Sequence, residues 1–236
     1  MEDEINNQNI ILVGDHHGQW DILFRKIEYY DLTDCVLLHV GDGGEGFITQ
    51  SLKQKRQYNI LNDRFKKRNI DYRSIRGNHS NKVWFDGSIC LSHFKLLPDY
   101  TVIKINGETW QFVGGAISVD RVYRKEGISY WKDEIFVLDP EKAVKCDILV
   151  THSAPPWIGP THKGEFVTGF YDKDPLLKDE LILERKLHQD LLDICQPKKH
   201  FCGHFHTSEV VKRYIQSGYE TESRILNINE FYPYRK

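Results

Sequence analysis

The chain has 236 residues with 32 basic and 34 acidic side chains, so its formal net charge is only −2. This balance excludes a strong global field of the kind that draws a protein to nucleic acid or to an anionic membrane. No stretch approaches the roughly 18 apolar residues that a membrane span needs. Residues 1–4 are mostly acidic without a secretory h-region, and the five cysteines are scattered, which predicts a cytoplasmic protein with reduced thiols.

The first hundred residues alternate between apolar, β-branched runs and amphipathic segments. Strands are predicted at residues 9–13, 35–40 and 72–75, and helices at residues 20–30 and 48–68. This alternation of strand and helix predicts parallel pairing with right-handed crossovers.

The pattern changes in the rest of the chain. A hairpin is predicted at residues 101–105 and 109–113, because Asn106-Gly107 suits a type I′ turn. A helix is expected at residues 176–195, and a second hairpin at residues 209–215 and 224–228 around Ser217-Gly218. Further strands are expected at residues 147–150 and 199–202.

Parallel strands early and hairpins later predict two sheets that lie face to face, with helices outside. The sequence contains neither an internal repeat nor a Pro/Gly-rich linker. Motifs that belong together are spread from residue 14 to residue 206. Their site cannot close unless nearly the whole chain folds as one unit, so residues 1–236 are expected to form a single domain.

Five short polar motifs each follow one of the predicted strands. Side chains just past the carboxyl ends of strands converge on one rim of a sheet, where α/β folds bind ligands. Two carboxylates, one amide and several imidazoles on one rim predict a site for two metal ions. The motifs are Gly14-Asp15-His16-His17-Gly18, Gly41-Asp42-Gly43-Gly44-Glu45, Gly77-Asn78-His79, Thr151-His152 and Gly203-His204-Phe205-His206.

These residue types suit the hydrolysis of a phosphate ester. Two cations about 3.5 to 4 Å apart acidify a bridging water and bind the oxygens of an in-line displacement. Asp42 is the candidate bridge, because a carboxylate has two charged oxygens. Asn78 offers a neutral oxygen, so two divalent ions, two aspartates and one hydroxide leave about one positive charge for an anionic phosphate.

The five motifs resemble, in order, the pattern of the calcineurin-like metallophosphoesterase superfamily: GD-x-HG, GD-x-x-D, GNH-D/E, an isolated His, and GH-x-H. The resemblance covers about four-fifths of the chain. It implies an α/β fold with two mixed sheets between helical layers, the four-layer α/β/β/α sandwich.

The resemblance also implies a role for each matching residue. The first metal would be held by Asp15, His17, Asp42 and His206. The second would be held by Asp42, Asn78, His152 and His204. His79 would not bind metal but would protonate the leaving oxygen or stabilise charge in the transition state.

The chain departs from the family pattern at two positions. Glu45 replaces the usual Asp of the second motif, and Ser80 replaces the usual acid of the third. Because that acid normally supports its neighbours, Ser80 leaves the orientation of His79 open.

Several residues have two readings. In the segment 114–121, Arg121 would either contact a substrate phosphate or be a surface arginine, and Asp120 is expected to orient its neighbours. His16 is expected to be partly exposed and His39 to be a core histidine. The long loop 153–174 would either form a substrate wall or be held down by its own aromatic side chains.

The leading interpretation is a phosphohydrolase that cleaves a phosphate ester by in-line attack of a metal-bridging hydroxide. Two divalent ions are implied, with Mn²⁺ expected and Fe, Zn or Ni as alternatives. A serine/threonine-phosphatase-like and a small-molecule or nucleotide phosphoesterase activity both remain open, as does monoester against diester cleavage. The alternative is a metal-binding interaction module of the same fold with weak catalysis.

Overall fold

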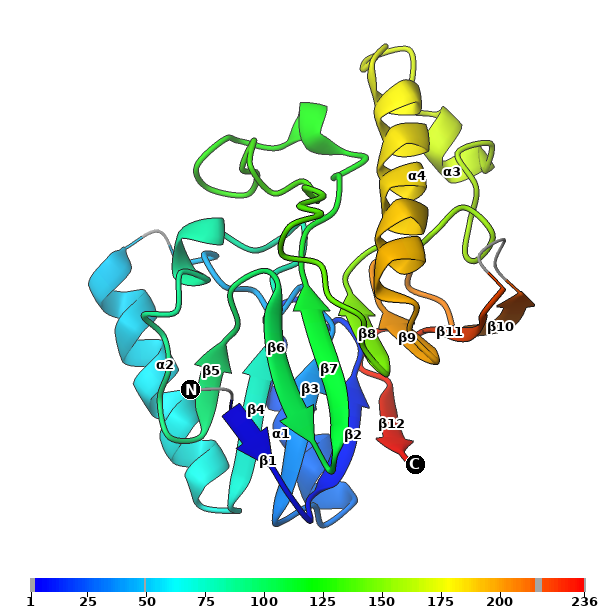
Figure 1. The fold of residues 1–236 in the computed structure, drawn as a ribbon. Coiled ribbons are helices and arrows are strands. Elements are labelled where there is room, and N and C mark those ends of the chain that lie inside the picture. Colours follow the sequence, from blue (N-terminus) through cyan, green and yellow to red (C-terminus); the bar gives the residue numbers. More distant parts are fainter. Residues whose placement is uncertain (1–2, 49, 215–217, 236) are drawn as a thin grey trace.

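The fold consists of two mixed β-sheets packed face to face between helices, as Figure 1 shows for this computed structural model. The structure describes residues 3–48, 50–214 and 218–235. The mixed α/β architecture predicted from the sequence is confirmed.

The first sheet contains, in the described residues, five strands in the order β12-β2-β3-β4-β5. Strands β2 to β5 run parallel, and β12 pairs antiparallel with β2. Helices α1 and α2 are the crossovers and cover the outer face, where Leu23 and Phe65 pack against Tyr72 and Phe94. The bounds are β2 Asn9–Val13, α1 Trp20–Tyr29, β3 Cys35–His39, α2 Ser51–Lys66, β4 Ile70–Ser74, β5 Phe94–Leu96 and β12 Phe231–Tyr234.

The second sheet contains, in the same part of the chain, seven strands in the order β1-β6-β7-β8-β9-β11-β10. The predicted hairpin of β6 and β7 is confirmed, with positive φ at both Asn106 and Gly107. Helix α4 packs against the part of this sheet near β8, where Leu191 and Leu192 share a buried cluster with Leu149. The bounds are β1 Asp3–Ile5, β6 Thr101–Ile105, β7 Glu108–Val113, β8 Ile148–Thr151, α3 Glu165–Thr168, α4 Leu177–Cys195, β9 Lys199–Cys202, β10 Glu209–Tyr214 and β11 Glu220–Ile225.

A buried apolar layer joins the two sheets. Leu12 and Leu38 of the first sheet face Trp110, Phe112 and Phe201 of the second. The side chains of these five residues are almost entirely buried, so the inter-sheet layer fixes how the two sheets sit relative to each other. No helix in the described ranges is long and apolar enough to cross a membrane.

The tail differs from its prediction. The second strand of the last hairpin spans Glu220–Ile225, not residues 224–228, because β11 also pairs in parallel with β9 and takes its register from that strand. The proposed turn residue Ser217 and the predicted strand end at residue 215 lie outside the described residues. Strands β1, β5 and β12 were not predicted.

The loops that carry the five motifs meet at one edge of the sandwich. They follow β2, β3 and β4 in the first sheet and β8 and β9 in the second. The carboxyl ends of parallel strands point the same way, so side chains from both sheets are brought together there.

Candidate metal centre

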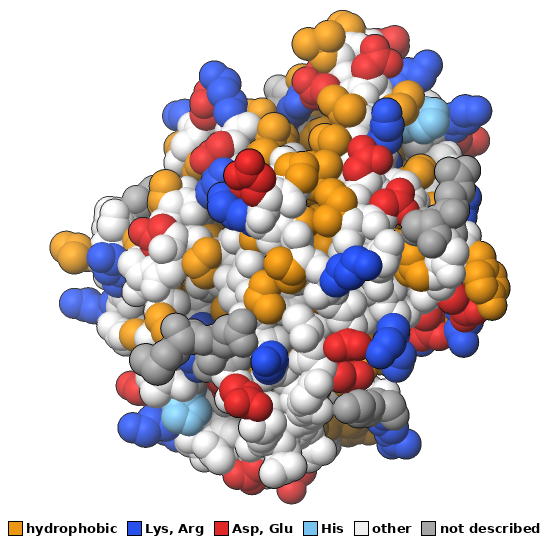
Figure 2. Space-filling view, viewed as in Figure 1, with side chains coloured by type: hydrophobic (Ala, Val, Ile, Leu, Met, Phe, Trp, Pro, Cys, Tyr) orange, Lys and Arg blue, Asp and Glu red, His pale blue; other side chains and the backbone are white. Residues whose placement is uncertain are grey.

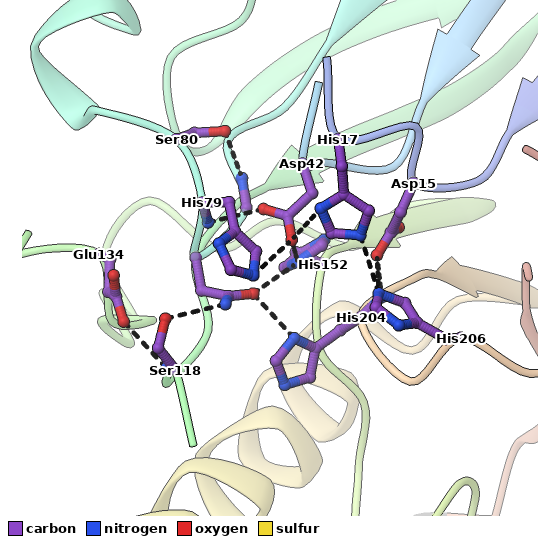
Figure 3. A network of polar contacts seen from close by, with 12 residues as sticks. Asp15, His17, Asp42, His79, Ser80, Ser118, Glu134, His152, His204 and His206 are labelled. Atoms are coloured by element: carbon purple, nitrogen blue, oxygen red, sulfur yellow. Dashed lines mark hydrogen bonds and ion pairs between the residues drawn. The ribbon is translucent and has the colours of Figure 1, made fainter. Parts of the chain in front are cut away.

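Two buried carboxylates form the middle of the site (Figure 3). Asp42 Oδ1 accepts the backbone N–H of His79 at 2.8 Å, and Asp15 Oδ2 accepts that of His204 at 3.0 Å. Among the described residues, Asp15 Oδ1 and Asp42 Oδ2 are buried without a hydrogen-bond partner. A buried carboxylate oxygen without a donor is costly, so both atoms are suited to bind a cation.

Three imidazoles surround the free oxygen of Asp42. His152 Nε2 lies 3.3 Å from Asp42 Oδ2, and His17 Nδ1 and His79 Nε2 each lie 3.8 Å from it. His152 Nδ1 is 2.8 Å from the carbonyl oxygen of Val40. Donation from Nδ1 to this carbonyl leaves Nε2 as the atom that faces the carboxylates, the usual arrangement for a metal-binding histidine.

The carboxylates make this pocket strongly attractive to positive charge. Burial lowers the pKa of His152, but Asp42 and Asp15 outweigh it and raise that pKa to about 9. Burial by itself would raise the pKa of Asp42, yet His152 and His79 hold it well below the usual value of 3.8. Asp42 is therefore ionised at neutral pH and favours a cation beside it.

Asn78 joins the same cluster through its oxygen. Asn78 Oδ1 lies 2.9 Å from His204 Nδ1 and 3.1 Å from His152 Nε2. On the other side, Asn78 Nδ2 donates to Ser118 Oγ at 2.9 Å, and the Ser118 backbone N–H donates to Glu134 Oε1 at 2.9 Å. These contacts orient the amide so that its oxygen faces the histidines.

His206, the most exposed histidine of the cluster, contacts Asp15 and His17. His206 Nε2 lies 3.5 Å from Asp15 Oδ2 and 2.9 Å from His17 Nε2. Asp15, His17 and His206 each offer a ligand atom within 4.8 Å of the others, and the same holds for two further sets, Asp15, Asp42 and His152, and His17, Asp42 and His79. The structure thus brings together all seven residues that the sequence predicted as ligands.

The backbone is unusual at the ligands themselves. It is left-handed at His17, Asp42, His204 and His206, with φ between 46° and 68°. Such conformations cost of the order of 1 kcal/mol or more and cluster at functional sites. Close packing adds a further constraint, because a Cβ at Gly203 would overlap the Asp15 carboxylate.

The C-terminal segment supports the first motif. The N–H of Gly14 donates to the carbonyl of Glu230 at 2.9 Å, and the N–H of Asn229 donates to the carbonyl of Asp15 at 2.7 Å. Strand β12 follows directly and pairs with β2. The backbone of residues 229–230 therefore helps to position Asp15.

The two departures from the family pattern contact each other. Ser80 Oγ donates to Glu45 Oε2 at 2.9 Å and accepts the N–H of Gly77 at 3.2 Å. Burial raises the pKa of Glu45 to about 7, although hydrogen bonds oppose this. A carboxyl group from the second motif thus supports the third motif, where the pattern would place an acid at residue 80.

Arg124, not Arg121, lies beside His79. The Arg124 guanidinium contacts both ring nitrogens of His79 and is held by Asp120 at 2.6 and 2.8 Å. Arg121 instead pairs with Asp174 at 2.6 Å and Glu180 at 2.5 Å. Arg121 begins a short 3₁₀ helix, Arg121–Tyr123, and Arg124 directly follows its end. The sequence signal for Arg124 is its spacing of four residues from Asp120, which was expected to orient its neighbours.

His79 is neutral in this setting. Burial lowers its pKa, Arg124 lowers it further, and Asp42 opposes both. A neutral imidazole has one acceptor nitrogen, which can accept from the Arg124 guanidinium, while the other ring nitrogen carries the N–H.

The other two histidines of interest belong to the core. The expectation that His16 is partly exposed is wrong: it is fully buried, packs on Trp20 and lies 3.2 Å from the Tyr72 hydroxyl. The turn at His17 directs it inward. His39 is a core histidine as predicted, with Nδ1 3.0 Å from Ser74 Oγ.

A comparison with protein families decides the relationship of this chain. Residues 8–208 match the family described as calcineurin-like phosphoesterase. The chain belongs to this family. No curated protein matches the chain. The similar solved structures include a serine/threonine phosphatase from Saccharomyces cerevisiae, described as similar to human phosphatase PP5. It is 15% identical, with 96% of this chain and 71% of that chain covered and a TM-score of 0.35.

Membership of the calcineurin-like phosphoesterases implies metal-dependent phosphoester hydrolysis in general. The residues fit that chemistry, since buried carboxylate oxygens without donors lie among imidazole nitrogens and an amide oxygen. This mixed oxygen and nitrogen set suits divalent transition metals.

Proposed function

We propose that this calcineurin-like phosphoesterase hydrolyses a phosphate ester at a centre that holds two divalent ions. The observation that carries the proposal is the position of Asp42 between two sets of donors. Asp42 Oδ2 lies 3.8 Å from His17 on one side and 3.3 Å from His152 on the other. A carboxylate in that position is able to bind two ions at once.

We divide the surrounding residues between two ions as the resemblance to the family pattern implies. The first ion is assigned to Asp15, His17, Asp42 and His206. The second ion is assigned to Asp42, Asn78, His152 and His204. We propose Mn²⁺ in both positions, with Fe, Zn or Ni as alternatives, because this donor set does not select one metal.

When bound, the two ions supply an activated water and positive charge for the phosphoryl oxygens. The chain adds a fixed cation of its own, since Asp120 holds Arg124 beside His79. The N–H groups of this guanidinium already face Asp120, His79 and the carbonyl oxygen of Ser129, so we propose that it contributes its positive charge beside the phosphoryl group. It also disfavours a third ion at His79, which supports a role for His79 as a hydrogen-bond donor to the leaving oxygen and not as a ligand.

The contact between Ser80 and Glu45 weakens the rival interpretation of a metal-binding interaction module. That interpretation rested on Ser80, because the usual acid of the third motif is missing. Glu45 supplies a carboxyl group to the same loop. A carboxyl group therefore still reaches the loop that carries Asn78 and His79, although residue 80 is a serine.

The test uses Asp42→Asn and His204→Ala, with His93→Ala as a histidine control outside the cluster. We expect both site variants to lose at least about 100-fold in turnover of p-nitrophenyl phosphate with excess Mn²⁺. The control variant His93→Ala should retain the turnover of p-nitrophenyl phosphate. Circular dichroism should show that all three variants fold. Metal content is measured on the same samples. Full turnover by either site variant would refute the assignment.

A further inference from the structure

A pocket of about 280 Å³ opens on the candidate metal centre. One end is formed by ligand residues, among them Asp42, Asn78 and His204. The Phe205 ring lies 4.9 Å from the His204 ring, so an apolar wall begins directly beside the centre. The wall is therefore within reach of a group that is esterified to a phosphate at the centre.

The wall is mostly apolar and comes from three separate segments. Val119 follows β7, Val167 and Phe166 lie in the short helix α3, and Leu181 lies in α4. Figure 2 shows hydrophobic side chains gathered between the segment that follows β7 and helix α4. A concave, largely apolar surface with a few polar groups at one end is typical of a small-molecule site.

Arg185 holds this wall in place. Its guanidinium donates to the carbonyl oxygens of Pro155 at 2.8 Å and Pro160 at 3.1 Å, and lies 4.6 Å from the centre of the Phe205 ring. One residue of α4 thus connects the loop after His152 to the loop that carries the last two ligands. The wall is formed before any substrate arrives, which lowers the entropy cost of binding.

Most charged side chains along the pocket are already paired. Arg124 is bound to Asp120, Arg185 to backbone carbonyls, and Glu184 accepts the N–H of Ile117 at 2.7 Å. His162 is half-buried in the lining. These hydrogen bonds engage the polar atoms of Arg185 and Glu184, so the middle of the pocket offers mainly apolar contact to the organic part of an ester.

Phe166 leaves an apolar surface uncovered at the pocket. Its side chain is 74% exposed, although it lines the pocket. Exposed apolar side chains that are grouped at a concave site mark ligand-binding surfaces, whereas scattered single ones need no explanation. A ligand with an apolar ring would cover this side chain.

We propose that this pocket binds the leaving group, and that the preferred substrates are phosphate esters of small, uncharged alcohols that carry a ring. Arylalkyl alcohols and nucleosides share this chemistry. This inference rests on the proposed function where it is tested by turnover, because that test requires the protein to hydrolyse esters. Its binding test stands independently.

The turnover test compares benzyl phosphate with ethyl phosphate, both esters of primary alcohols, in the presence of excess Mn²⁺. We expect kcat/KM to be at least about tenfold higher for benzyl phosphate, the effect of a few apolar groups in a matching pocket. A nucleoside 5′-monophosphate is the third substrate in this test. If its kcat/KM is higher than that of benzyl phosphate, the preferred leaving group is a nucleoside and not an arylalkyl alcohol. Equal kcat/KM for benzyl and ethyl phosphate would overturn the proposal.

The variants Leu181→Ala and Phe166→Ala test the wall itself, and Leu183→Ala is the matched control. Leu183 lies on the same helix but is exposed and does not line the pocket. We expect the ratio of benzyl to ethyl phosphate turnover to fall towards one in the two wall variants and to stay unchanged in the control. An unchanged ratio in both wall variants would contradict the assignment of the wall.

Binding of benzylphosphonate and ethylphosphonate, which have no ester bond, separates this inference from the proposed function. Tighter binding of benzylphosphonate by the Mn²⁺-loaded protein, measured by calorimetry, supports the pocket even if no ester is hydrolysed. Equal affinities with active hydrolysis would leave the function standing and refute the pocket.

Discussion

The side-chain amide of Asn78 donates to the hydroxyl of Ser118 at 2.9 Å, which leaves its oxygen facing His152 and His204. We expect Ser118→Ala to free this amide to rotate and to weaken Mn²⁺ binding about 10- to 100-fold, as loss of support for a ligand does. Calorimetric titration with Mn²⁺ measures this. Ser92→Ala, at an exposed serine, is the control, and an unaltered affinity in Ser118→Ala would show that the contact does not orient the ligand.

Glu134 gives the folded protein a dependence on pH. Burial raises its pKa from 4.5 to about 7, against hydrogen bonds from Ser118. The protonated form therefore stabilises the fold, fully below pH 4.5, and this contribution disappears as the pH rises through 7. Between low and high pH, this contribution to the free energy of unfolding changes by about 3 kcal/mol at most.

The variant Glu134→Gln cannot lose a proton, so we expect its stability relative to the natural protein to improve between pH 5 and pH 8. The expected gain in the free energy of unfolding is about 2 to 3 kcal/mol. Urea unfolding in EDTA at the two pH values measures it. If the difference between the two proteins stays constant with pH, the buried carboxyl group is not the source.

Arg124 and Arg121 provide a direct comparison. Arg124 contacts His79, whereas Arg121 is bound to Asp174 and Glu180. We expect Arg124→Ala to lower kcat/KM for p-nitrophenyl phosphate about 100-fold, because it removes the fixed positive charge beside His79 and the negative charge that develops in the reaction. Arg121→Ala should change it little. Equal losses in both variants would restore Arg121 as a substrate-binding candidate.

Gly203 leaves no room for a side chain beside Asp15. We expect Gly203→Ala to displace the carboxylate and to weaken Mn²⁺ binding, at a cost in stability of about 1 to 3 kcal/mol from the overlap. Gly169→Ala is the control, because a Cβ there meets its neighbours only at ordinary contact distance. Calorimetric titration with Mn²⁺ measures the affinity of both variants, and thermal unfolding measures their stability. Normal binding in Gly203→Ala would mean that the loop adjusts without moving Asp15.

Metal removal should be visible in thermal unfolding. A ligand at about 100 times its Kd stabilises a protein by about 2.7 kcal/mol, which for this size corresponds to a rise in Tm of about 5 to 10 °C. We expect this rise when Mn²⁺ is added to EDTA-treated protein, and its loss in Asp42→Asn. A Tm that is indifferent to Mn²⁺ would argue against a resident metal.

Local sequence patterns predicted much of the fold. The strands that precede the motifs are short apolar runs, and α1 and α4 have apolar residues on one face, so both follow from periodicity. The missed strands β1 and β12 pair with β6 and β2, which lie far away along the chain, and β5 has only three residues. β12 even contains Pro233, which an edge strand tolerates but a sequence pattern does not favour.

The candidate site was predicted where residues lie directly in the motifs. Asp15, Asn78 and His204 need only a strand and the turn after it. Arg124 was missed because its place depends on the turn of the 3₁₀ helix Arg121–Tyr123, which no periodicity reveals. The contact of Ser118 with Asn78 joins residues 40 positions apart, and only the assembled fold brings them together.

The hydrogen bonds of Gly14 and Asp15 to residues 229–230, and the pairing of β12 with β2, have a consequence for synthesis. A growing chain on the ribosome contains every proposed donor once residue 206 has been added. The backbone that steadies the first of them is made some twenty residues later. For the proposed centre we therefore expect stable binding of the ions only after residues 229–230 have been made, and we expect a chain that stops after residue 226 to contain all the proposed donors but to bind metal weakly.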